Sequence, residues 1–219
     1  MIAWLAGATG LVGNLLLQRL LEDARYAHVV ALTRRPIELE HPRLRVHITD
    51  FDALPDSAPD GHVDHAYCCL GTTRKAAGSA AAFRRVDLEY VLAFGKAAVQ
   101  AGASHCILNS SAGAEITSRN LYLHTKGEAE AGLSALGFAT VDVVRPGLLL
   151  GQRAELRVGE RLGQWATPVF NPLLMGGLRR YKSISAETVA QAMAAAPWVE
   201  GAGVRVHHFD EMVGLSQRG

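Results

Sequence analysis

The amino-acid sequence predicts a single α/β domain in which helices cover both faces of a doubly wound parallel sheet. Short apolar runs alternate with longer amphipathic segments along the first 150 residues. The runs are apolar throughout, as in strands that are buried on both faces. A glycine-rich turn joins the first run to the first amphipathic segment, and the 49% hydrophobic content of the 219 residues suffices for one sizeable core.

About seven strands follow from the apolar runs. Their expected ranges are 2–6, 28–32, 44–48, 63–70, 104–109, 140–144 and 204–207. A loop rich in Pro, Asp and Ser over 52–61 separates the third strand from the fourth. Pro146 stops the sixth strand because proline lacks the amide hydrogen that strand pairing needs.

The expected helices alternate with these strands. Their ranges are 11–21, 81–101, 119–136 and 186–196. Gly102 and Gly137 end the second and third helices, since glycine readily adopts the left-handed conformation found there. Ser185 is the expected N-cap of the fourth helix, and Glu187 is favourable in its first turn.

Composition excludes several classes of function. The net charge of +1 argues against a nucleic-acid surface, and no apolar run reaches the ~20 residues of a membrane span. The N-terminus lacks a signal-peptide pattern, so we expect a cytoplasmic protein. Cys68, Cys69 and Cys106 form neither a disulfide framework nor a metal-binding spacing, so no metal is expected. A monomer and a homodimer both remain open.

The glycine-rich turn over residues 7–13 predicts a dinucleotide-binding site. Glycine permits a tight turn and a close approach of the backbone to phosphate oxygens, while the following helix presents its amide N–H groups and positive end. The spacing is GxxGxxG rather than the commoner GxGxxG, and an ordinary strand–helix turn is the alternative. The predicted phosphate-binding residues are Gly7, Thr9, Gly10, Leu11, Val12 and Gly13.

Arg34 and Arg35 end the second strand, where an acidic residue would bind the ribose 2′-hydroxyl of NAD. A guanidinium instead matches a phosphate with two hydrogen bonds, which predicts NADP(H) in preference to NAD(H). Two solvated arginines are the alternative. Asp50 and Phe51 end the third strand and are placed to meet the adenine, although Asp50 is equally suited to cap the loop.

The end of the fourth strand also points toward the cofactor. Leu70, Gly71 and Thr72 are expected against its ribose and pyrophosphate, because glycine at a strand end lets the backbone pass close to a ligand. Arg74 and Lys75 follow directly, either as contacts to phosphate or substrate or as a solvated basic loop.

Tyr122 and Lys126 are the strongest catalytic candidates. They lie four residues apart on an expected helix and therefore share a face. A nearby ammonium favours the phenolate and lowers the tyrosine pKa, which makes Tyr122 a usable general acid or base. Lys126 is also placed to bind the nicotinamide ribose. Ser110 and Ser111 end the fifth strand, where either hydroxyl is placed to hydrogen-bond a substrate oxygen.

The end of the sixth strand is expected near the nicotinamide. The residues are Arg145, Pro146 and Gly147, with a structural ion pair as the alternative role for Arg145. Within residues 152–182, a helix is expected over 158–167, and the segment 168–177 is apolar and irregular. Residues 152–182 fit a lid or substrate-side insertion, or a hydrophobic contact between subunits.

These motifs carry a family resemblance. GATGLVG, YLHTK and VVRPGLLL resemble the atypical short-chain dehydrogenase/reductase superfamily. The segments CCLGTTR, FRRVDLEYV, LNSSAGA, NLYLHTKGEAE and VVRPGLLLG resemble more closely the Tat-interacting protein family, an oxidoreductase-like group. The resemblance covers residues 1–151. It implies a Rossmann fold, NADP(H) binding and a Ser–Tyr–Lys set carried by Ser110 or Ser111, Tyr122 and Lys126.

Two classes of function follow. The first is an NADP(H)-dependent oxidoreductase acting on a small carbonyl or alcohol substrate. The second is an NADP(H)-sensing regulatory protein without turnover. A nucleoside-diphosphate-sugar epimerase is less well supported, because Val86 and Asp87 stand where such enzymes often place an asparagine, and the chain is shorter.

Overall fold

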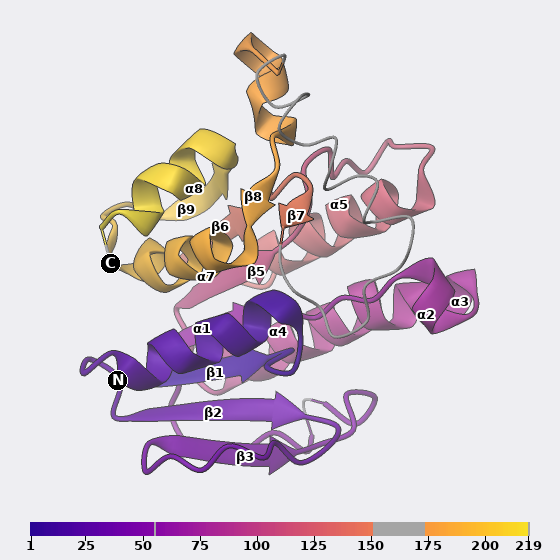
Figure 1. The fold of residues 1–219 in the computed structure, drawn as a ribbon. Coiled ribbons are helices and arrows are strands. Elements are labelled where there is room, and N and C mark those ends of the chain that lie inside the picture. The colour runs from indigo at the N-terminus through magenta and orange to yellow at the C-terminus, as the bar shows by residue number, and fades with distance from the viewer. Residues whose placement is uncertain (55, 151–173, 219) are drawn as a thin grey trace.

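The computed structural model describes residues 1–54, 56–150 and 174–218, and these form a seven-stranded parallel sheet between layers of helices (Figure 1). The strand order is β3-β2-β1-β4-β5-β6-β9, and every pairing is parallel. The strands are β1 (Ile2–Ala6), β2 (His28–Thr33), β3 (Leu44–Ile48), β4 (His65–Cys68), β5 (His105–Asn109), β6 (Thr140–Val144) and β9 (Gly203–His207). The order reverses between β1 and β4, which places a ligand crevice beyond the carboxyl ends of those two strands.

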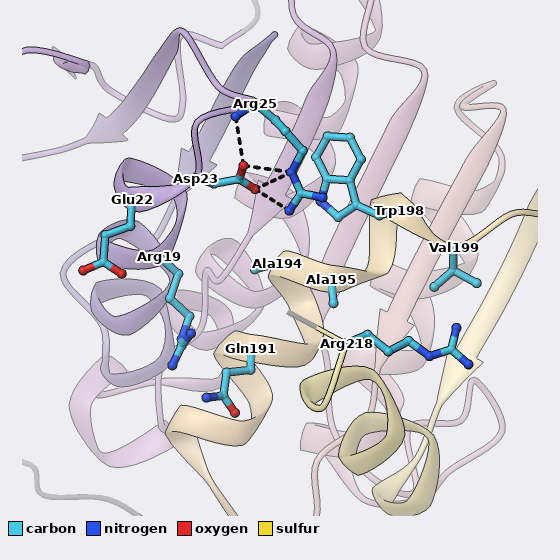
Figure 2. Close-up of a pocket in the computed structure, with 10 residues that line it drawn as sticks. All are labelled: Arg19, Glu22, Asp23, Arg25, Gln191, Ala194, Ala195, Trp198, Val199 and Arg218. Carbon is cyan, nitrogen blue, oxygen red and sulfur yellow. Dashed lines mark hydrogen bonds and ion pairs between the residues drawn. The ribbon is translucent and has the colours of Figure 1, made fainter.

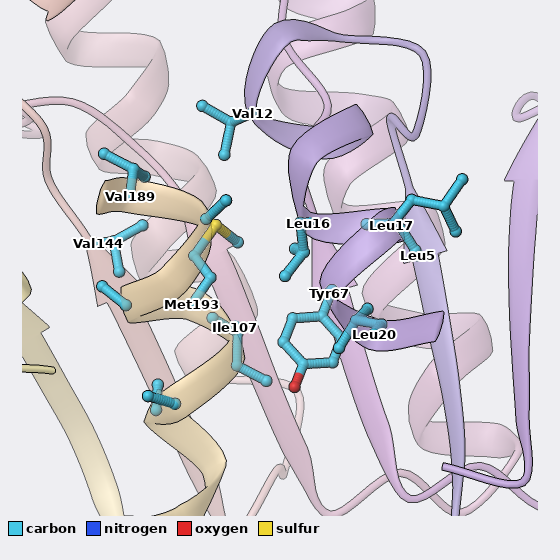
Figure 3. Close-up of a cluster of buried hydrophobic side chains, with 14 of the residues drawn as sticks. Leu5, Val12, Leu16, Leu17, Leu20, Tyr67, Ile107, Val144, Val189 and Met193 are labelled. Carbon is cyan, nitrogen blue, oxygen red and sulfur yellow. The ribbon is translucent and has the colours of Figure 1, made fainter. Parts of the chain in front are cut away.

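Two hydrophobic cores hold the helices against the sheet. On one face lie α1 (Leu11–Glu22), α7 (Ala186–Ala195) and α8 (Phe209–Ser216). Figure 3 shows Leu16 and Leu20 of α1 and Met193 of α7 gathered over Tyr67 and Ile107 of the sheet. The opposite face packs against α4 (Tyr90–Gln100) and α5 (Leu121–Ser134). Burial of each Leu side chain contributes about 1.5–3 kcal/mol.

The expected helix over 81–101 is interrupted. The chain forms α3 (Ala80–Arg84), a single π-helical segment η1 (Arg85–Glu89) and then α4. A π turn accommodates an extra residue and changes which side chains face inward. Here Asp87 becomes fully buried.

Most other expected elements are confirmed within a few residues. The sixth strand matches in both bounds, and Ser185 caps α7 by accepting a hydrogen bond of 2.9 Å from the amide of Thr188. The fourth strand is shorter than expected. The edge strands β3 and β9 expose much of their length, so the expected burial of strands on both faces of the sheet holds for the inner strands only. Elements that were not anticipated include α2 (Arg74–Ala77), α8 and the two-stranded sheet of β7 (Leu149–Leu150) and β8 (Ile184–Ser185).

The expected helix over 158–167 and most of the expected lid over 152–182 lie outside the described residues. The single-domain organisation with that insertion therefore stays a prediction. The described part of the insertion ends in η3 (Gly176–Tyr181), a 3₁₀ helix without buried residues.

Candidate cofactor groove and active site

Glycines at positions 7 and 13 let three backbone segments approach one another. Gly7 has a φ of 85°, and its carbonyl accepts a hydrogen bond of 3.0 Å from the amide of Gly10. A Cβ on Gly7 would lie 2.5 Å from the backbone carbonyl of Cys69, and a Cβ on Gly13 would overlap the carbonyl oxygen of Gly7. The turn thus requires glycine at both positions. Gly10 caps α1 without a side-chain acceptor, so the first amides of α1 remain available to an anion.

A groove runs along this turn and consists of two adjoining hollows of about 430 and 470 Å³ that share Gly10, Cys69, Leu70 and Gly71. Most of the predicted residues line it. They are Gly7, Thr9, Gly10, Leu11, Val12, Gly13, Arg34, Arg35, Phe51, Leu70, Gly71, Thr72, Ser110, Tyr122 and Lys126. Asp50, Ser111, Arg145, Pro146 and Gly147 do not. The groove therefore brings the glycine turn and the Tyr–Lys pair to one surface.

The outer end of the groove carries positive charge. Arg34 and Arg35 are exposed there, and Thr33 donates a hydrogen bond of 2.5 Å to the carbonyl of Arg35. Phe51 forms a buried wall and stacks on Tyr90, with ring centroids 5.5 Å apart. This end thus offers two cations beside an aromatic surface.

Asp50 has the loop-capping role that was its alternative. Its carboxylate accepts a hydrogen bond of 3.1 Å from the amide of Asp52. The first hollow includes Phe51 but not Asp50, so the carboxylate contributes to the loop rather than to the groove wall.

The inner end of the groove holds a buried ion pair. The Lys126 ammonium lies 2.8 Å from a carboxylate oxygen of Asp87, and both side chains are buried. The other oxygen of Asp87 accepts a hydrogen bond of 2.8 Å from the amide of Thr72. Burial lowers the pKa of Lys126, but the charges of Asp87 and Tyr122 outweigh it and raise that pKa above its ordinary value. Lys126 is therefore held as a cation.

Tyr122 stands at the mouth of this inner hollow and is 37% exposed. Asn120 caps α5 by accepting hydrogen bonds of 2.9 and 3.3 Å from the amides of Tyr122 and Leu123. The Tyr122 ring packs on Phe83 with centroids 5.9 Å apart. Its hydroxyl forms no hydrogen bond within the described residues, so the phenol is free to meet a substrate.

A second buried network lies behind the groove. Ser110 donates to a carboxylate oxygen of Glu130, and Arg145 donates to the same oxygen at 3.0 Å. Arg145 thus has the structural pairing that was its alternative role. The Ser111 hydroxyl makes a 3.5 Å contact with the carbonyl of Ala112. The amide of Ala112 donates to the carbonyl of Pro146 at 2.8 Å.

Sequence reasoning missed Asp87 and Asn109 as site residues. Asp87 was considered only as a departure from the epimerase pattern, and nothing near it in the sequence indicates its pairing with Lys126. Asn109 lines the inner hollow, and its side-chain oxygen is buried without a hydrogen-bond partner in the described chain. A buried oxygen without a partner inside a groove points to a donor on a ligand. This oxygen and the glycine cradle together suit a ligand that carries both phosphates and hydrogen-bond donors, as a dinucleotide does.

Another hollow, of about 400 Å³, lies between α1 and α7 (Figure 2). Asp23 holds Arg25, whose guanidinium lies 3.8 Å from the ring centre of Trp198, and Arg19 is paired with Glu187. Within the described part of the chain, no tyrosine, serine, histidine or lysine lines this hollow. Its lining includes the carboxylates of Glu22 and Asp23, whereas the groove holds the phenol of Tyr122 beside the Lys126–Asp87 pair.

Neither a metal cluster nor a membrane span occurs in the described parts of the chain. No three His, Cys, Asp or Glu side chains there are arranged to hold a metal ion. None of the helices there combines the length and apolarity that crossing a bilayer requires. The three cysteines are free thiols.

Comparison with known proteins places this geometry in a family. A family model described as NAD(P)H-binding matches residues 7–197. Protein HTATIP2 of Rattus norvegicus is 40% identical over 166 residues, which cover 74% of this chain and 68% of the relative. Protein FMP52 of Eremothecium gossypii, labelled mitochondrial, is 38% identical over 154 residues, or 70% of this chain and 68% of that protein. The expected cytoplasmic location thus stays a prediction.

Solved structures share the fold at low identity. The human epimerase family protein SDR39U1 with NADPH has a TM-score of 0.63 at 20% identity, covering 95% of this chain and 74% of that one. MoeE5 in complex with UDP-glucose and NAD has a TM-score of 0.68 at 18% identity, covering 100% and 81%. The Rossmann-like fold and the family resemblance are both confirmed. The chain belongs to the NAD(P)H-binding family and, within it, is a relative of protein HTATIP2.

Proposed function

We propose that this protein is an NADP(H)-dependent oxidoreductase that interconverts a small carbonyl compound and its alcohol. One observation carries the proposal: Tyr122 and the buried Lys126–Asp87 pair open into the groove that begins at the glycine turn. A protein that only bound a dinucleotide would have no need of a phenol beside a cation at that position.

The chain's residues have distinct roles in cofactor binding. The amides at the start of α1 bind the pyrophosphate, and Arg34 and Arg35 bind the 2′-phosphate. Phe51 contacts the adenine, and Lys126 binds the nicotinamide ribose. NADP(H), when bound, supplies or accepts the hydride.

Tyr122 handles the proton. In reduction its hydroxyl donates a proton to the carbonyl oxygen of the substrate, and in oxidation the phenolate accepts one from the alcohol. The Lys126 ammonium lines the same hollow as the Tyr122 phenol, and Asp87 keeps that ammonium charged in a buried position.

Ser110 assists only after a local rearrangement. The Ser110 hydroxyl donates its hydrogen bond to Glu130. In this arrangement it can accept a hydrogen bond from a substrate but cannot donate one. Arg145 continues to satisfy Glu130 when the Ser110 hydroxyl turns toward a substrate carbonyl. The serine can therefore change partner without leaving a buried carboxylate unpaired.

Thermal melting with NADPH and NADH tests the cofactor preference. A ligand at 100 times its Kd stabilises the folded protein by about 2.7 kcal/mol. We expect NADPH to raise the melting temperature more than NADH, and the R34A/R35A double variant to lose that difference. Arg45→Ala removes an exposed arginine on β3 and is the matched control. Equal shifts with the two cofactors in the wild type reject the preference for NADP(H).

Carbonyl reduction by Tyr122→Phe tests the chemistry. We expect turnover to disappear while the NADPH-induced melting shift is retained, because the ring remains and only the proton donor is lost. Tyr181→Phe, which alters another exposed tyrosine, should keep full turnover. Unchanged turnover by the Tyr122 variant rules out the proposed proton transfer.

A cofactor-sensing protein without turnover is the second candidate. The hydrogen bond from Ser110 to Glu130 favours the sensor, because it leaves the Ser110 hydroxyl without a hydrogen to donate to a substrate carbonyl. Tight NADPH binding without oxidation of NADPH across a broad panel of carbonyl compounds would support the sensor.

A further inference from the structure

The arginines of the described chain differ in whether a carboxylate pairs with them. Seven in the described chain form ion pairs with a carboxylate: Arg19, Arg25, Arg84, Arg85, Arg145, Arg179 and Arg205. Four others border the groove and its mouth, and their side chains have no partner within the described residues. Arg34 and Arg35 lie at the adenine end, and Arg74 and Arg119 lie at the opposite end beside Tyr122.

Arg74 and Arg119 line a hollow of about 520 Å³ that adjoins the inner groove. Thr72, Thr73 and Tyr122 line both spaces, so the phenol stands where they meet. The two arginines come from separate elements: Arg74 begins α2, and Arg119 precedes the Asn120 cap of α5. The remaining lining residues are Asn120 and Leu121.

Among the described residues, none that lines this hollow carries a negative charge. The nearby carboxylate of Asp87 is already paired with Lys126. Arg74 and Arg119 are both exposed and both line this hollow, so their positive charges act on the same space. A guanidinium presents a planar fork of donors that fits a carboxylate or phosphate with two hydrogen bonds.

Resting on the proposed oxidoreductase function, we propose that the substrate carries an anionic group, a carboxylate or a phosphate. Arg74 and Arg119 bind that group while the carbonyl or alcohol carbon of the same molecule faces Tyr122. The anion is thus the recognition handle and the carbonyl is the reacting group.

Two aldehydes that differ in charge test this assignment. The probes are 4-carboxybenzaldehyde and its methyl ester, methyl 4-formylbenzoate, each with saturating NADPH. We expect kcat/KM to be at least about tenfold higher for the acid, because a charge-assisted hydrogen bond contributes at least the 1.4 kcal/mol that corresponds to a factor of ten. A third probe, 4-formylphenyl phosphate, distinguishes a phosphate site from a carboxylate site.

The R74A/R119A double variant should remove the preference. Its KM for the acid is expected to rise about tenfold or more, with little change in kcat for either probe and little change in KM for the ester. Arg218→Ala, which removes an exposed arginine near the C-terminus, is the control. The melting shift with NADPH should be the same in all three proteins, which verifies folding and cofactor binding.

Calorimetric binding of the same probes to the NADP⁺-loaded protein separates the two proposals. Binding of the acid without turnover of any probe leaves the anion site standing and contradicts the oxidoreductase. Equal turnover of acid and ester leaves the oxidoreductase standing and overturns the anion site. The anion site is also overturned if the acid and the phosphate bind no better than the ester, or if the double variant retains the preference.

Discussion

Replacing Asp87 with asparagine isolates the charge of one buried carboxylate. The amide keeps the size of the side chain and an acceptor for the Thr72 amide, but it leaves the Lys126 ammonium buried without a counter-charge. Removing one partner of a buried ion pair costs about 3–5 kcal/mol. Because Lys126 can release its proton instead of remaining charged, we expect the lower end, about 3 kcal/mol.

Urea unfolding at pH 7, followed by tryptophan fluorescence, measures this loss. Thermal melting gives a second measurement. For a chain of this length each 1 kcal/mol of unfolding free energy corresponds to about 2–4 °C in melting temperature, so the variant should melt about 6–12 °C lower than the wild type. Asp210→Asn is the matched control, because its partner Arg179 and the carboxylate are both about half exposed. Solvent and salt screen that pair, and its loss should change stability little.

The double variant Asp87→Asn with Lys126→Met completes the test. Removing both charges leaves no uncompensated ion, so the double variant should be more stable than Asp87→Asn alone. A loss from Asp87→Asn no larger than that of the control, or a double variant less stable than the single one, would refute the reasoning.

Two further predictions concern the glycine-rich turn and the buried side chain of His65. Gly13→Ala should prevent the NADPH-induced melting shift and lower stability, whereas Gly214→Ala, whose Cβ meets open space, should do neither. Burial and the neighbouring His105 lower the pKa of His65 to about 4. As pH falls below 6.5 the unfolded chain takes up the proton first, so stability should fall by up to about 3 kcal/mol between pH 6.5 and 4. Urea unfolding across that range should show a weaker dependence in His65→Gln.

The inner strands were predictable because their local pattern and their environment agree. Four of the five residues of Thr140–Val144 are β-branched, a proline follows shortly after, and the bounds match. The fourth strand was predicted two residues too long at each end. At the carboxyl end the reason is that β1 turns away at Gly7, so its pairing with β4 stops at Cys68. A strand ends where its partner ends, and its own sequence does not contain that information.

The break in the helix over 81–101 has no local signal. The η1 residues from Arg85 to Glu89 suit an ordinary α-helix, and only the contacts of Asp87 distinguish them. Those contacts are with the Thr72 amide and the Lys126 ammonium, both distant in the sequence. We infer that they stabilise the π turn, because an uninterrupted α-helix would direct Asp87 elsewhere and leave Lys126 without a partner.

Contacts between residues distant in the sequence also determine the roles of Ser110 and Arg145. Their positions at strand ends were therefore not enough to predict those roles. Asn109 and Val144 are in register on adjacent strands, so the residues that follow them emerge side by side. Glu130 of α5 lies against both and engages each side chain. Strand order identifies the polar groups that gather at the groove, whereas the competing partners within the fold decide which of them remain for a ligand. The Tyr122 hydroxyl and the guanidinium groups of Arg74 and Arg119 keep that freedom in the described chain, and they are therefore the groups whose substitution should alter substrate selection before it alters folding.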